Sequence, residues 1–86
     1  MEKIKKYIED NLEEATKRYT YYTKRIEDRK RELLVKSNSK FENEDERRRT
    51  LHIIENDIYY LTYERDLNQD KMMKFQEMYN ELEVCV

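Results

Sequence analysis

Residues 51–63 read LHIIENDIYYLTY, and this stretch carries apolar side chains on more than one side of a predicted helix. One stripe repeats at steps of three and four residues, as a helix face does, and consists of Leu51, Ile54, Ile58 and Leu61. A second stripe consists of Ile53, Tyr60 and Tyr63 and continues to Leu67. One neighbouring helix covers only one stripe. The sequence therefore predicts that the chain associates with something besides its own second helix.

The composition favours long solvated helices. The chain has 86 residues, which allows one domain, and it contains neither Gly nor Pro. A chain without Gly lacks the tight hairpin turns of small β proteins and the loops that cradle phosphates. Charged residues make up 44% of the chain, but they alternate in sign and the apolar residues are periodic. The net charge of −2 gives no global attraction to nucleic acid or to an anionic membrane.

The sequence also indicates the cellular compartment of the protein. No apolar run approaches the ~20 residues of a membrane span, and the first ten residues lack a signal-peptide core. Cys85 is the only cysteine, so an intrachain disulfide is excluded and a reducing compartment is the simplest interpretation. We expect a cytoplasmic protein, in the host cytoplasm if a phage encodes it, with Cys85 as a terminal thiol without a role.

The first helix is expected at residues 1–36. Asp10 with Glu13 has the spacing of a capping box, so either a short N-terminal helix ends near residue 10 or one helix runs unbroken. From residue 8 onward the spacing is that of a heptad repeat. The repeat consists of Ile8, Leu12, Ala15, Tyr19, Tyr22, Ile26, Arg29 and Leu33.

A loop is expected at residues 37–43, because the sequence SNS at 37–39 favours turns and left-handed conformations. The second helix is expected at residues 44–84. Its cap is either Ser39 or Asn43, since each stands three residues before a glutamate.

The predicted fold class is all-α: an antiparallel two-helix, coiled-coil-like hairpin in a single domain, residues 1–86, that self-associates into a helical bundle. With the turn near residue 40, facing residues have numbers that add to about 80, so Ile26 meets Ile54 and Ala15 meets Arg65. Such a hairpin buries one narrow seam, so we expect a homodimer or a higher oligomer. The expected oligomer or partner interface consists of Tyr7, Tyr21, Ile53, Tyr60, Tyr63 and Leu67.

Two polar residues, Arg65 and Asn68, interrupt the apolar seam of the second helix. Polar seam residues fix the register and the oligomeric state. The alternative is a cationic pocket, in which Arg65 and nearby tyrosines bind a phosphate-bearing small molecule such as a nucleotide. The candidate ligand-binding residues are Tyr19, Tyr22, Tyr63, Arg65 and Asn68.

No catalytic site, metal site or cofactor is expected. His52 is the only histidine and lies far from Cys85 along the second helix, which excludes a Cys–His pair within one chain. An EF-hand calcium loop requires a Gly, and the chain contains none. The basic run RRR at 47–49, with tyrosines nearby, leaves a nucleic-acid-binding hairpin as a further alternative, but interleaved acids argue against it.

The expected function is therefore binding: a small non-enzymatic helical adaptor or inhibitor of a protein partner. Phage and mobile-element products that act on host machinery are often of this size and composition, and this analogy supports the expectation.

Overall fold

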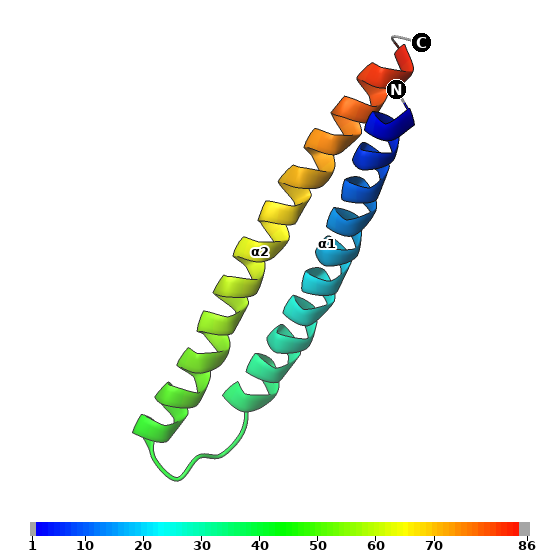
Figure 1. The fold of residues 1–86 in the computed structure, drawn as a ribbon. Coiled ribbons are helices and arrows are strands. Elements are labelled where there is room, and N and C mark those ends of the chain that lie inside the picture. The colour runs from blue at the N-terminus through cyan, green and yellow to red at the C-terminus, as the bar shows by residue number, and fades with distance from the viewer. Residues whose placement is uncertain (1, 85–86) are drawn as a thin grey trace.

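The computed structural model describes residues 2–84 and consists of two long helices joined by a short loop (Figure 1). Helix α1 spans Glu2–Ser37 and helix α2 spans Glu44–Val84. The helices run antiparallel, so the start of α1 and the end of α2 lie at one end of the molecule (Figure 1). The predicted all-α hairpin is confirmed. Helix α1 continues through Asp10, as the unbroken alternative requires. Cys85 lies outside the described residues.

Helix α2 begins at a capping asparagine. The Oδ1 of Asn43 accepts a hydrogen bond from the backbone N–H of Glu46 at 2.8 Å, which satisfies one free donor of the first helical turn. The acidic residues of this turn also place negative charge at the positive end of the helix dipole. Of the two caps that the spacing allowed, the structure uses Asn43.

Helix α1 ends without a left-handed residue. No described non-glycine residue has a positive φ, so the left-handed conformation expected at residues 37–39 is wrong. The Oγ of Ser37 instead donates to the carbonyl of Leu33 at 2.6 Å, and the Nδ2 of Asn38 donates to the carbonyl of Leu34 at 3.1 Å. The carbonyl of Leu34 also accepts the backbone N–H of Asn38 at 3.3 Å, and the N–H of Ser39 donates to the carbonyl of Lys36 at 3.2 Å. The last turn of α1 is thus satisfied without a glycine.

The core is one narrow seam between the helices. Its buried apolar residues are Ile8, Ala15 and Ile26 of α1 and Ile54 and Leu61 of α2. Asn68 is also buried, with 2% of its surface exposed. The Cα positions extend 65 × 17 × 14 Å, so the hairpin is a thin rod. Each helix covers one side of the other and leaves the remaining sides open.

The helices meet about one turn away from the register that the loop position suggested. That register places Ala15 opposite Arg65, whereas Ala15 and Asn68 line the same small hollow. Arg29 likewise pairs with Asp57, which lies beyond its expected partner in α2. Helical side chains lean toward the N-terminus of their helix, and in an antiparallel pair both leans shift the contacts in the same sense. Counting backbone positions alone omits this shift.

Candidate interaction surface

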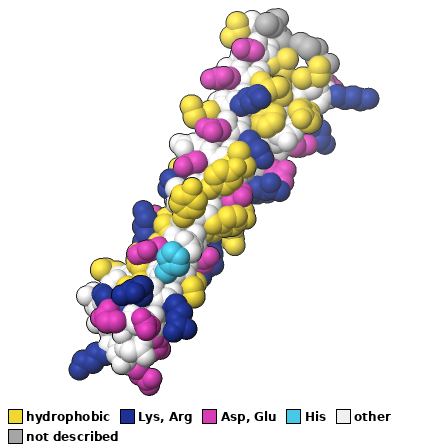
Figure 2. Space-filling view, turned by 90° about the vertical axis from the view of Figure 1, so that its left-hand side faces the viewer, with side chains coloured by type: hydrophobic (Ala, Val, Ile, Leu, Met, Phe, Trp, Pro, Cys, Tyr) yellow, Lys and Arg dark blue, Asp and Glu magenta, His cyan; other side chains and the backbone are white. Residues whose placement is uncertain are grey.

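Helix α2 carries a column of exposed apolar residues seven positions apart, Ile53, Tyr60 and Leu67. Steps of seven return to the same side of a helix in a coiled coil. The exposed fractions of these residues are 62%, 57% and 39%, whereas Ile54 and Leu61, each one position further on, are buried. The column therefore flanks the seam and remains open in the single chain. Seen from the α2 side, apolar side chains form a band over the middle and terminal parts, while the loop end is mostly charged (Figure 2).

Helix α1 adds Tyr7 and Tyr21 to the same side of the hairpin. The ring of Tyr21 packs edge-on against Tyr22, with the ring centroids 5.2 Å apart, and Tyr22 lies near enough to Tyr60 to affect its ionisation. Tyr7 packs edge-on against Phe75 of α2 at 6.2 Å. Both helices thus contribute exposed residues to one side of the hairpin, where Glu14 separates Tyr7 from Tyr21 on α1. We call it the tyrosine face and define it by Tyr7, Tyr21, Ile53, Tyr60 and Leu67.

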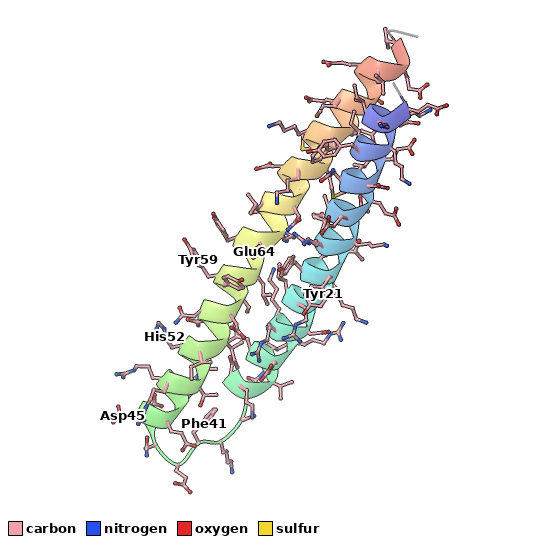
Figure 3. The ribbon with its side chains drawn as sticks, viewed as in Figure 1. Tyr21, Phe41, Asp45, His52, Tyr59 and Glu64 are labelled. Carbon is pink, nitrogen blue, oxygen red and sulfur yellow. The ribbon has the colours of Figure 1, made fainter. Side chains whose placement is uncertain are left out.

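Tyr63, the sixth predicted interface residue, lies beside this column, three positions after Tyr60 and four before Leu67. It follows the buried Leu61 by two positions, which places it on the side of α2 away from α1. Tyr63 is 61% exposed, and Tyr59, one turn earlier, is 80% exposed and projects into solvent (Figure 3). All six predicted residues are thus exposed in the single chain, and Tyr63 lies at the outer edge of the tyrosine face, on the side of α2 away from α1.

The phenol of Tyr60 has an acidic neighbour. The negative charge of Glu64 raises the pKa of Tyr60 above its ordinary value, and partial loss of water and the nearby Tyr22 add to this effect. Glu64 and Tyr21 lie at similar heights on the two helices (Figure 3). Tyr60 therefore stays protonated over the physiological pH range and presents a neutral hydroxyl on an aromatic ring.

Charged residues line the tyrosine face on both helices. Arg18 and Arg25 stand seven positions apart on α1, and Asp57 and Glu64 stand seven positions apart on α2. Arg18 pairs with Glu14 of its own helix, with Nη2 and Oε1 2.7 Å apart. These four residues place positive charge on α1 and negative charge on α2 around the middle of the rod, while Glu14 and Lys71 carry the opposite signs nearer the terminal end.

The five candidate ligand-binding residues do not converge on one pocket. Asn68 is buried in the seam, where its Nδ2 donates to a backbone carbonyl one turn earlier at 2.8 Å. Arg65 pairs with the adjacent aspartate at 3.1 Å, and Tyr63, two positions before it, lies on another side of α2. Tyr19 and Tyr22 are half-buried on α1.

Two hollows near the seam differ from a nucleotide site in size or in charge. The hollow shared by Ala15 and Asn68 has a volume of about 50 Å³, well below the roughly 300–1,000 Å³ of small-molecule pockets. A larger open groove of about 430 Å³ contains no Arg or Lys to bind a phosphate. The sequence pattern did not single out this groove, although adjacent methionines on α2 were a signal for it. It is lined by Leu12, Thr16, Met72, Met73, Gln76 and Glu77.

His52 lies at the loop end, on the first turns of α2 (Figure 3). Together with Asp45, Arg48 and Arg49 it lines a shallow hollow of about 420 Å³. All four residues come from one helix, where the acidic residues 44–46 directly precede the arginines 47–49 and Arg47 pairs with Glu44 at 3.9 Å.

Residues 2–84 contain no group of three or more His, Cys, Asp or Glu side chains placed to hold a metal ion. Over the same residues, neither helix is apolar enough for long enough to cross a membrane. No protein-family model matches the chain, and no curated protein or solved structure matches it.

Proposed function

We propose that the chain is a small non-enzymatic interaction protein that acts as an oligomer and binds other protein surfaces. The observation that carries the proposal is the exposure of the tyrosine face, where Tyr21 and Tyr60 expose 57% of their surface each. Large contiguous apolar surfaces are uncommon on soluble monomers and mark interaction sites. Tyrosine is enriched at such sites, because its ring supplies apolar area and its hydroxyl supplies a hydrogen bond.

The shape of the hairpin supports an adaptor or an inhibitor. A rod 65 Å long presents several helix faces at fixed spacing, and a helix with an apolar face docks into grooves or against other helices. The open groove lined by Leu12 and Met72 provides a second apolar surface, separate from the tyrosine face. A cytoplasmic setting and a phage or mobile-element origin belong to this proposal by analogy with small proteins of similar composition.

Two adjacent tyrosines provide a matched test. Tyr60→Lys places a charge on the tyrosine face, whereas Tyr59→Lys makes the same substitution at a residue that is already 80% exposed. We expect Tyr60→Lys to abolish association with another chain or with a partner protein, and Tyr59→Lys to leave association intact. Circular dichroism should show the same helix content in both variants. Equal association in the two variants, measured by light scattering after size exclusion, would contradict the proposal.

A further inference from the structure

We infer that a second copy of this chain covers the tyrosine face, related to the first by a twofold axis along the length of the hairpin. In this dimer the two loops lie at the same end of a four-helix bundle. The inference rests on the proposed function and deepens it, because it identifies the occupant of the face and its orientation.

The exposed area is sufficient for such a dimer. A compact protein of 10.9 kDa exposes about 5,600 Å² by the usual scaling of surface with mass, whereas this chain exposes 7105 Å². The excess is about 1,500 Å², and a stable interface takes about 800 Å² from each partner. A second copy has the same excess surface and the same apolar residues, so one interface buries exposed apolar surface on both chains.

Two twofold arrangements bring the tyrosine faces of two copies together. If the axis runs along the hairpin, the loops share one end and α1 of each copy faces α2 of the other. If the axis runs across the hairpin, the loops lie at opposite ends, and α1 faces α1 while α2 faces α2. Neighbouring helices are antiparallel in both arrangements, so the helix dipoles do not distinguish them.

The charges beside the tyrosine face do distinguish them. Arg29 pairs with Asp57 across the seam, and Arg25 lies one turn earlier on α1, at a similar height. A further step of seven positions on each helix brings Arg18 to the height of Glu64. With the loops at the same end, Arg18 therefore faces Glu64 of the second copy, and Arg25 faces its Asp57.

If the loops lie at opposite ends and the axis passes near Tyr60, each of these residues faces a residue of the same charge. Arg18 then faces Arg25 of the second copy, and Asp57 faces its Glu64. Like charges placed opposite each other across an interface disfavour that arrangement, while opposite charges favour association. The charges of these four residues, positive on α1 and negative on α2, thus favour the same-end dimer.

The apolar residues fit the same arrangement. At the middle of the rod Tyr21 faces Tyr60 of the second copy, and an offset or edge-on pair of rings is favourable there. Near the terminal end Ile4 and Tyr7, 54% and 59% exposed, lie at the height of Met78 of the second copy, which is 37% exposed. Two copies thus cover one another's exposed residues at two separate levels of the bundle.

The distance between the two loops tests the orientation directly. We would replace Cys85 with Ser and Lys40, an exposed loop residue, with Cys, and attach a spin label for pulsed electron paramagnetic resonance. The same-end dimer predicts a distance of about 20–30 Å, or two to three helix diameters. A distance close to the 65 Å length of the hairpin would overturn the orientation but leave self-association standing. A monomer, with no distance, would overturn the whole inference.

Charge reversal supplies a second and independent readout. In the same-end dimer Arg18→Glu opposes Glu64 of the second copy, so the dimer dissociation constant should rise about tenfold. Adding Glu64→Arg to the same chain should restore dimerisation, because the reversed charges then face one another. In the opposite-end dimer Arg18→Glu would instead tighten association by relieving its repulsion with Arg25. Sedimentation equilibrium of the three proteins measures these changes, and tightening in the single variant would overturn the inference.

Discussion

Arg29 of α1 reaches across the seam and binds Asp57 of α2 through its Nη2, while its Nη1 donates to Glu32 of its own helix at 2.5 Å. The hydrogen bonds to Glu32 and then to Asp57 raise the pKa of Arg29 above its ordinary value. The guanidinium is half-buried, so it lies among the apolar contacts of the seam with both acids as partners. This ion pair ties the two helices together close to the loop.

Asp57→Asn should lower the free energy of unfolding by about 0.5–1 kcal/mol, because it removes the interhelical charge from a partly exposed pair. Asp70→Asn removes an equal charge from an exposed position on the same helix and serves as the control. Urea denaturation followed by circular dichroism measures both variants. Equal midpoints for the two variants would show that the Arg29–Asp57 contact does not stabilise the fold.

Asn68 opposite Ala15 makes the seam less stable and more specific. Its Oδ1 is buried and has no hydrogen-bond partner among the described residues, and its neighbour across the seam is small. Asn68→Leu should raise the stability by about 1–3 kcal/mol, since it removes a buried unsatisfied acceptor. The same change should loosen the register, because a polar seam residue favours one alignment over others.

The exposed Asn56 of the same helix provides the control for this prediction, since Asn56→Leu leaves the seam unchanged. Thermal unfolding reports the change in stability, and the number of backbone amide peaks in a two-dimensional NMR spectrum reports the number of registers. A higher melting temperature with one set of peaks would contradict the role of Asn68 in fixing the register.

Asn43 should determine where α2 begins. Its Oδ1 accepts the hydrogen bond from the N–H of Glu46, and loss of a capping side chain costs about 1 kcal/mol. Asn43→Ala should lower the stability by this amount, and Asn43→Asp should preserve it, because aspartate caps equally well. Hydrogen exchange of the first amides of α2 locates the effect. Unchanged exchange in Asn43→Ala would mean that another group caps the helix.

Tyr60 should make the fold sensitive to alkaline pH. Glu64 raises the pKa of Tyr60, so the folded chain holds this proton more tightly than the unfolded chain. The stabilisation is therefore fully present below the pKa of an unfolded tyrosine, about 10, and is lost as the pH rises through the higher folded pKa. Glu64→Gln should lower the pKa of Tyr60 and reduce this loss.

Ultraviolet absorption of tyrosinate follows the titration, and Tyr60→Phe identifies the contribution of this residue among the eight tyrosines. The difference in absorbance between wild type and Tyr60→Phe should titrate with a pKa above that of an ordinary tyrosine. When both proteins also carry Glu64→Gln, this pKa should lie closer to the ordinary value. A difference curve that Glu64→Gln leaves in place would contradict the assigned cause.

The sequence predicted most of the fold, because the determinants are local. The heptad spacing places Ile26, Ile54 and Leu61 in the seam, and the structure buries all three. The capping spacing at Asn43 marks the start of α2, and the absence of Gly and Pro leaves both helices uninterrupted. The exposed column of Ile53 and its heptad equivalents followed from the same periodicity.

The sequence pattern did not predict the register of the two helices or the contacts of individual polar groups. The lean of helical side chains shifts contacts along the partner helix, so Ala15 meets Asn68 where backbone counting expected Arg65. The Arg29–Asp57 pair was missed for the same reason. Arg65 and Tyr63 were expected to cooperate, but residues two positions apart on a helix face different directions. The occupant of the tyrosine face is a second molecule. The sequence of this chain contains information about that molecule only if it is another copy of the same chain.

The mass of the wild-type protein in solution tests the central claim most directly. Size exclusion with light scattering at micromolar concentration should give an oligomer, about twice the 10.9 kDa of the chain for the dimer that covers the tyrosine face. Dilution should lower the mass toward that of one chain, because a noncovalent dimer dissociates as its concentration falls. A stable helical monomer of 10.9 kDa at micromolar concentration would contradict the account.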